Sequence, residues 1–566
     1  MRKVTRRLLL YLLPIALVAL VGRDLYTPDE PREAAMVVAM VKQADKSLPT
    51  LAGAPFAEKP PLLYWLGAAS ASVAGDSPAA LRLPGLLYIL LTALSIAALV
   101  RPVAGDTGAF LAGFSSATAY ILYRTETWLA TDAPLVMGVA VALLGIQRML
   151  TATSDTARRK AHAWLFAGLL ASFFAKGPAG WLVPGSVLLG TIALERRWGE
   201  LWRRDFLLGA ALMLAPIVAW ILWVAQNPAG LHSLQVLFWY NLLGRFVKIA
   251  AAPELSYANG HHNHPLDYWL SVPLYLLPWT PLVIAALARA PTALRGSDAV
   301  ATTWRIALNA IALPMVFLAL SATGRDVYYG PVALGFVIII GLWFGAVRSN
   351  DDRATQLAWT VTRSVVGVLV ALIGGIAIVA NLAPAFRTNQ SVALAALALV
   401  GMLAALVLVV GRIGNAQIVP RVALAVALCF TVLIGSLYPP LDRWLSLESF
   451  SRRVTGVTGD AALRLVEPDE TTEAMAALYL PNVARETSVR DAQRALWLVP
   501  DQSQWKVRQW LGFLGYTTTT SEPTSMPPLP EALRDWVAAC VLVRPGGRRV
   551  VIAERPSIDD AGKHCD

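Results

Sequence analysis

Long apolar runs recur along the first 440 residues, and they constrain the fold more than any other feature of the chain. A helix needs roughly 20 apolar residues to cross the hydrocarbon core of a bilayer. Such runs occupy residues 8–22, 82–100, 107–123, 133–150, 162–175, 179–194, 206–225, 267–288, 305–321, 331–347, 362–383, 391–411 and 421–438. The pattern predicts an α-helical polytopic membrane protein with about thirteen transmembrane helices.

Charge is scarce and unevenly placed. Only 15% of the 566 residues are charged, whereas soluble domains carry about a quarter. The basic residues gather in short loops, as in MRKVTRR at the start, and such loops stay in the cytoplasm. This rule puts the N-terminus inside and, by alternation, the loop 23–81 and everything after about residue 439 outside. The net charge of +11 is thereby explained by orientation, without any nucleic-acid partner.

The composition changes at the end of the apolar region. Residues 447–566 contain Asp, Glu, Thr and Pro in soluble proportions, with a short apolar run at Ala495–Val499 and a hairpin-like pattern at Val541–Glu554. We therefore expect a transmembrane domain over 1–440 and a small α/β domain over 441–566 on the outer face. Cys540 and Cys565 could pair in an oxidising compartment or remain free thiols, and the sequence does not decide between the two.

The first outer loop, 23–81, holds several charged residues between strongly apolar spans. Ionisable groups beside a bilayer are costly, so they are functional candidates. Asp29 precedes a stretch, 31–42, that predicts an amphipathic helix on the membrane surface. An acidic first helical turn is the structural alternative for Asp29. Glu58 and Lys59 stand before two prolines, and an exposed charged turn is their alternative.

Further candidates lie in other outer loops, and each has a plain structural alternative. Asp132 comes where a span begins and could cap its helix. Lys176 stands before Gly-Pro and could be a snorkelling lysine. His264 belongs to the histidine-rich loop NGHHNHPLDYW, which could bind metal or be an ordinary polar loop. Arg325 and Tyr328 lie in SATGRDVYYGP, which could be a solvated turn.

Together these motifs resemble a known family. The chain resembles the bacterial polyprenyl-phosphate-sugar glycosyltransferases of the GT-C fold. The motifs that carry this resemblance are DEPRE after the first span, EKPPLLYW before the second, and the later TD, AKGP, NLLGRF with HHNHP, and SATGRDVYYGP. The best-known members are the lipid A aminoarabinose transferases, and the protein O-mannosyltransferases are related. The resemblance covers residues 8–440. One departure is Glu33, where the aminoarabinose transferases have Tyr.

The resemblance assigns roles to particular residues. It implies three catalytic residues, which are Asp29, Lys59 and Asp132. It implies a binding site for the donor phosphate, formed by Lys176, Arg325 and Tyr328. It also implies that a divalent metal ion is held by Glu58 and a histidine, taken here as His264. No nucleotide cofactor is implied.

The implied function is transfer of a sugar from an undecaprenyl-phosphate-linked donor to an envelope acceptor, lipid A, on the periplasmic face of a bacterial inner membrane. The expected partners are this donor, the lipid or glycan acceptor and membrane lipids, and the expected state is a monomer. A protein O-glycosyltransferase is one alternative, and a sugar-lipid transporter is another. A transporter should carry polar residues within its spans, and this chain carries few.

Overall fold

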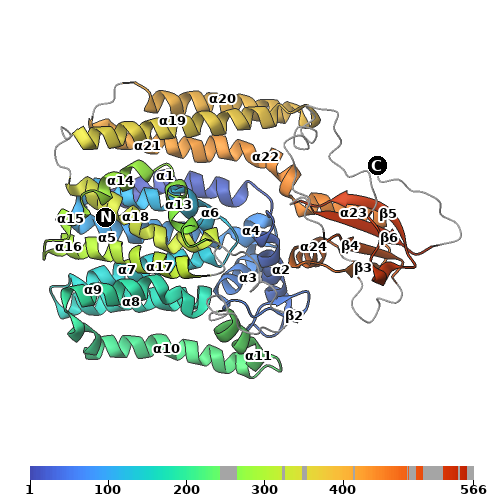
Figure 1. The fold of residues 1–566 in the computed structure, drawn as a ribbon, viewed down its shortest axis with the longest axis horizontal. Coiled ribbons are helices and arrows are strands. Elements are labelled where there is room, and N and C mark those ends of the chain that lie inside the picture. Colours follow the sequence, from blue (N-terminus) through green and yellow to red (C-terminus); the bar gives the residue numbers. More distant parts are fainter. Residues whose placement is uncertain are drawn as a thin grey trace.

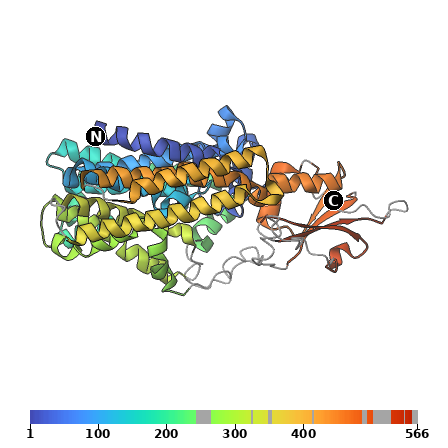
Figure 2. The ribbon, with the colours of Figure 1, turned by 90° about the horizontal axis from the view of Figure 1, so that it is seen from above.

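The computed structural model describes residues 1–241, 264–321, 325–346, 353–411, 415–480, 482–483, 492–500, 527–545 and 548–556. These residues form a bundle of long helices with a small sheet-containing domain at one end (Figure 1). The N-terminus lies at the end of the bundle away from this domain in both views (Figures 1 and 2). Whether the two lie on opposite sides of a membrane stays a prediction.

The bundle is built from the apolar runs of the sequence. Its helices are α1 (Arg2–Val21), α5 (Pro84–Thr118), α6 (Tyr120–Thr127), α7 (Asp132–Leu150), α8 (Asp155–Lys176), η1 (Gly177–Trp181), α9 (Leu182–Glu195), η2 (Trp198–Trp202), α10 (Arg204–Ala225), α11 (Gly230–Gln235), η3 (Val236–Tyr240), α13 (Asp267–Tyr275), α14 (Thr280–Leu287), α15 (Ala290–Ala293), α16 (Ala299–Asn309), α17 (Ala312–Leu320), η5 (Asp326–Tyr328), α18 (Tyr329–Ala346), α19 (Arg353–Asn381), η6 (Pro384–Phe386), α20 (Asn389–Val409), α21 (Asn415–Leu428), η7 (Cys429–Leu433) and α22 (Ile434–Leu445). Within the described residues, 10 helical segments are long and apolar enough to cross a membrane.

Two of these segments are each 41 residues long, Pro78–Thr118 and Asp155–Glu195. That is about twice the length that a span requires. Each is broken at a glycine with positive φ, Gly105 (φ 72°) and Gly177 (φ 62°), a conformation that only glycine adopts readily. When each half is counted as a span, and the bent pair α13 and α14 as one more, the described helices account for the thirteen expected spans.

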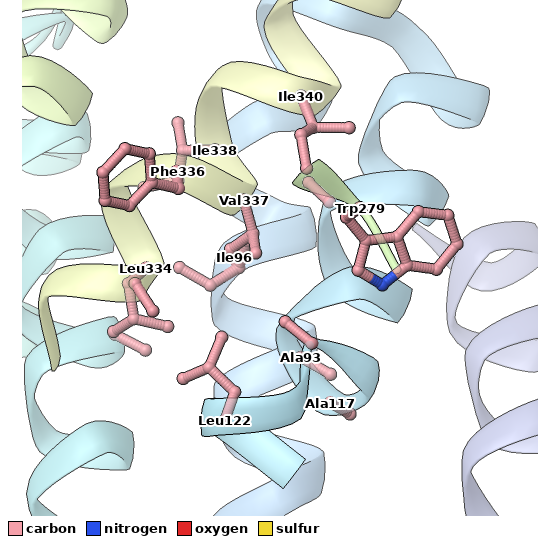
Figure 3. Packing of buried hydrophobic residues seen from close by; sticks show 14 of the residues in the cluster. Ala93, Ile96, Ala117, Leu122, Trp279, Leu334, Phe336, Val337, Ile338 and Ile340 are labelled. Carbon is pink, nitrogen blue, oxygen red and sulfur yellow. The ribbon is translucent and has the colours of Figure 1, made fainter. Parts of the chain in front are cut away.

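The apolar core lies at the centre of the bundle, where α5, α6, α7 and α18 meet. Figure 3 shows Ile96 of α5, Leu122 of α6 and Val337 of α18 close together in this core. Small residues let the helices approach, since a Cβ on Gly341 of α18 would lie 2.7 Å from the carbonyl oxygen of Gly108.

The first outer loop forms compact structure between the bundle and the small domain (Figure 1). It contains α2 (Asp29–Lys42), α3 (Leu62–Ala74), α4 (Pro78–Arg82) and the short antiparallel pair β1 (Thr50–Leu51) and β2 (Ala54–Pro55). The amphipathic helix expected over 31–42 is present, and it begins two residues earlier. Most of its residues are buried because it packs against α3 on one side and the small domain on the other.

The small C-terminal domain is α/β, as the sequence predicts. Helix α22 continues through residue 440 to Leu445, and the domain follows with α23 (Leu447–Thr458), β3 (Leu463–Val466), α24 (Glu470–Tyr479), β4 (Arg494–Leu498), η9 (Glu531–Leu533), β5 (Val537–Val543) and β6 (Arg549–Glu554). The sheet order is β3-β4-β6-β5, with β3 and β4 parallel and the other pairs antiparallel. Both α23 and α24 pack on one face of the sheet. Cys540 is buried in β5, and Cys565 lies outside the described residues.

Candidate functional site

A cavity of about 170 Å³ lies among α7, α8, η1, α9 and α17, with one polar and one apolar part. Six of the eight predicted site residues line its polar part, which are Glu58, Lys59, Asp132, Lys176, Arg325 and Tyr328. Apolar side chains line the remainder, including Leu135, Leu182, Val183, Leu237, Phe317, Leu318 and Val332. The chain therefore brings loops that are far apart in sequence around a single amphipathic pocket.

Lys176 and Asp132 form an ion pair inside this cavity. Asp132 is the first residue of α7, but its carboxylate accepts a hydrogen bond from Lys176 Nζ, and Thr131 occupies the N-cap position. Lys176 ends α8 just before the break at Gly177 and lies 4.4 Å from the centre of the Tyr328 ring. The lysine is therefore held between a carboxylate and an aromatic face, and only 15% of its side chain is exposed.

Lys59 is held by a second carboxylate, that of Glu33. Lys59 Nζ lies 3.1 Å from Glu33 Oε1, and the Tyr64 hydroxyl donates to Glu33 Oε2 at 2.7 Å. Arg32 also reaches Glu33 Oε1, at 3.1 Å. Burial raises the pKa of Glu33, but the charges of Lys59 and Arg32 outweigh burial and lower the pKa below its usual value. Glu33 is therefore an ionised carboxylate that neutralises Lys59.

Asp29 lies beside the cavity and faces a separate small hollow of about 10 Å³. Lys59, Asp132 and Arg325 line both spaces. Arg325 donates to Asp29 Oδ2 at 2.5 Å, which shows that this arginine is more than part of a solvated turn. Burial raises the pKa of Asp29, but the charges of Arg325, Arg32 and Lys59 outweigh it and lower the pKa to about 2. Asp29 is therefore ionised at neutral pH.

Each cation that lines the cavity has a carboxylate partner. Lys176 pairs with Asp132, Lys59 with Glu33, and Arg325 with Asp29. A phosphate that enters the cavity would therefore exchange with these carboxylates for the same donors. These ion pairs neutralise the three cations, which would be costly to bury without a partner.

The described residues do not provide a set of metal ligands. No group of three or more His, Cys, Asp or Glu side chains within them is placed to hold a metal ion. Glu58 lines the cavity, whereas His264 is exposed and its Nδ1 accepts a hydrogen bond from the Leu266 amide at 3.2 Å. The neighbouring His261 and His262 lie outside the described residues. The expected metal thus stays a prediction, and no chemical step below depends on it.

A buried cluster around Glu30 was not anticipated from the sequence. Glu30 is fully buried and accepts six hydrogen bonds. The guanidinium groups of Arg23 and Arg82 donate two each, and the backbone amides of Tyr26 and Leu129 donate one each. The cluster fixes the start of α2 to α4 and to the segment before α7. One signal was present, since Arg82 interrupts an apolar run at a membrane boundary.

Comparisons with known proteins agree with this architecture. Residues 58–223 match the family described as dolichyl-phosphate-mannose-protein mannosyltransferase. An undecaprenyl phosphate-alpha-4-amino-4-deoxy-L-arabinose arabinosyl transferase from Edwardsiella ictaluri is 25% identical over 377 residues, which cover 65% of this chain and 63% of that protein. Its counterpart from Pseudomonas aeruginosa is 27% identical over 341 residues, covering 59% of this chain and 57% of that protein. The matched region thus spans less than two thirds of these relatives.

The structural likeness extends over the whole chain. The crystal structure of ArnT from Cupriavidus metallidurans bound to undecaprenyl phosphate superposes with a TM-score of 0.69, covering 97% of this chain and 98% of that one at 20% identity. The apo form of ArnT gives a TM-score of 0.67 at the same identity. Together with the apolar helices, this likeness indicates a multi-pass membrane protein fold. The predicted resemblance is thus confirmed: the chain has the GT-C membrane fold of ArnT and is similar to bacterial aminoarabinose transferases and protein O-mannosyltransferases.

Proposed function

We propose that the chain is a membrane glycosyltransferase that moves a sugar from an undecaprenyl-phosphate-linked donor to lipid A. The observation that carries the proposal is the amphipathic cavity, in which apolar walls lead to Lys59, Lys176 and Arg325. A polyprenyl phosphate has an apolar chain and an anionic head, so it matches both parts. The relatives' names support this donor class and make 4-amino-4-deoxy-L-arabinose the first sugar to test.

The proposed chemistry is cleavage of the bond between the sugar and the donor phosphate. Negative charge develops on the phosphate as this bond breaks, and fixed cations stabilise that charge most strongly where water is excluded. Lys59 and Lys176 lie in such a place, because apolar side chains form the rest of the cavity. In this proposal they release Glu33 and Asp132 as they take up the phosphate.

Asp29 has a different role in the proposal. An efficient general base has a pKa near the operating pH, whereas the pKa of Asp29 is lowered to about 2, with burial outweighed by Arg325 and the other cations. Asp29 therefore removes protons poorly but provides a permanent negative charge. That charge would stabilise the positive sugar carbon in the transition state. A phosphate group of lipid A is already ionised, so it would need no base as an acceptor.

The site would act on the periplasmic face. The basic N-terminal segment supports a cytoplasmic N-terminus. The cavity shares Lys59, Asp132 and Arg325 with the hollow beside Asp29 of α2. Helix α2 contacts the C-terminal domain, which lies at the end of the bundle away from the N-terminus (Figure 1). The donor's chain would remain in the membrane while its head enters the cavity. We expect the protein to act as a monomer.

The test is transfer by the purified, detergent-solubilised protein from labelled undecaprenyl-phosphate sugar to lipid A. Lys176→Gln should raise the KM for the donor by roughly tenfold or more, since a hydrogen bond to a charged group contributes about 1.5–3 kcal/mol. Lys160→Gln is the matched control, because Lys160 is exposed near the other end of the same helix. Protein that transfers nothing but carries the donor across vesicle membranes would favour the transporter alternative.

Mass spectrometry of lipid A supplies the corresponding test in cells. A strain that lacks this protein should lose a sugar substituent from lipid A and regain it on complementation. Unchanged lipid A, with the loss of a sugar from an envelope protein, would favour the protein O-glycosyltransferase alternative.

A further inference from the structure

The C-terminal domain contacts the helix that carries Asp29. Helix α24 of this domain packs against α2, and Ala474 is fully buried in the same apolar cluster as Ala34 and Val37 of α2. Leu478 packs against this cluster as well. The contact places the first turn of α24 next to the first turn of α2.

Arg32 is the centre of the polar contact between these two helices. Its guanidinium lies 2.5 Å from Glu470 of α24, 3.1 Å from Glu33 and 3.4 Å from Asp29. Arg32 is buried and lies 5.6 Å from the centre of the Phe56 ring. A buried guanidinium is stable only where carboxylates surround it, so its position depends on all three partners.

The C-terminal domain holds Glu470 in place from its own side. Asp469 caps α24 by accepting hydrogen bonds from the amide and hydroxyl of Thr472, at 2.8 and 2.7 Å. Arg544, which follows β5, clamps the same carboxylate with two bonds of 2.6 and 2.9 Å. Such bidentate pairs fix geometry strongly. The start of α24 is therefore tied to the sheet, and Glu470 is its first residue.

We infer that Glu470 is a positioning residue for the proposed glycosyl transfer, and that the C-terminal domain thereby completes the reaction centre. This inference rests on the proposed function. Glu470 draws one side of the Arg32 guanidinium away from Asp29, which leaves Asp29 paired with Arg325. Without this pull, Arg32 would move toward Glu33 and Asp29, the two carboxylates that its guanidinium also contacts, and displace Asp29 from the sugar carbon.

The inference predicts a specific kinetic effect. Glu470→Gln should lower kcat roughly tenfold, the scale of one hydrogen bond between charged groups. The KM for the undecaprenyl-phosphate donor should change much less than kcat, because in the ion pairs described above Glu470 contacts neither Lys59 nor Lys176 directly and reaches Lys59 only through Arg32 and Glu33. Glu470→Asp, which keeps the charge on a shorter side chain, should restore part of kcat. Glu448→Gln is the matched control, since Glu448 pairs with Arg452 on the surface of the same domain.

The experiment measures kcat and KM for each purified variant, together with its thermal unfolding in the same detergent. A normal kcat for Glu470→Gln in protein whose unchanged form transfers sugar would overturn the inference. A fall in kcat that only follows the loss of folded protein would also overturn it, since it would indicate a structural role. Absence of transfer by the unchanged protein, under conditions where it is folded, would overturn the proposed function and this inference with it.

Discussion

Glu30→Gln should destabilise the protein, although Glu30 and Asp29 are neighbours in the same helical turn. Glu30 accepts six hydrogen bonds and neutralises two buried arginines, Arg23 and Arg82. A glutamine of the same shape carries no charge, and its NH₂ group would face donors. Removing one partner of a buried ion pair costs about 3–5 kcal/mol.

The pKa shift of Glu30 gives a similar value for its contribution to the free energy of unfolding. Burial raises this pKa, but the charges of Arg23 and Arg82 outweigh burial and lower it from 4.5 to about 2. A difference of this size corresponds to about 3 kcal/mol of stability at neutral pH. Because the folded-state pKa lies below the unfolded value of 4.5, this stabilisation is fully present above pH 4.5 and is lost as the pH falls toward about 2.

The assay is thermal unfolding of the detergent-solubilised protein, followed by fluorescence at a series of pH values. Glu30→Gln should unfold at a clearly lower temperature than the unchanged protein at neutral pH, and the difference should narrow below pH 4.5. Asp106→Asn is the control, because Asp106 forms an exposed ion pair with Arg101, and such pairs contribute about 0–1 kcal/mol. Equal unfolding temperatures for Glu30→Gln and the unchanged protein at neutral pH would refute this reasoning.

Three further predictions concern the site and the topology. Asp29→Asn should keep the fold but reduce sugar transfer by on the order of a hundredfold or more, because a fixed charge at the reaction centre is lost; normal transfer in the labelled-donor assay would remove Asp29 from the mechanism. A reporter that is active only in the cytoplasm, fused after Asp566, should stay silent because the C-terminal domain is expected outside. A strong signal would mean that the loops assigned to the outer side lie on the cytoplasmic side. If Glu58 and His264 bind a divalent ion, Glu58→Ala and His264→Ala should each lower the metal content measured by mass spectrometry, whereas equal content in all three proteins would leave them as ordinary polar residues.

The span pattern and the polar segments could be predicted from the sequence because both depend on local properties. Apolar length decides whether a helix crosses a bilayer, and the position of basic loops decides its direction. The hairpin pattern at Val541–Glu554 likewise predicted β5 and β6. The predicted Asp29, Lys59, Asp132 and Lys176 do gather at one end of the bundle, although their chemical roles stay predictions. Residues 259–263 of the histidine-rich loop lie outside the described residues.

The partners of these residues were decided by the tertiary structure alone. Asp132 and Lys176 are 44 residues apart, Asp29 and Arg325 are 296 apart, and Arg32 and Glu470 are 438 apart. No local pattern specifies such pairs, because each depends on how α2, α7, α8 and the C-terminal domain pack. The same packing buries Asp29 among cations and so lowers its pKa, with burial itself opposing the change. The sequence alone thus determined which charged residues lie between the apolar spans, and long-range packing decided which charges meet and in what ionisation state.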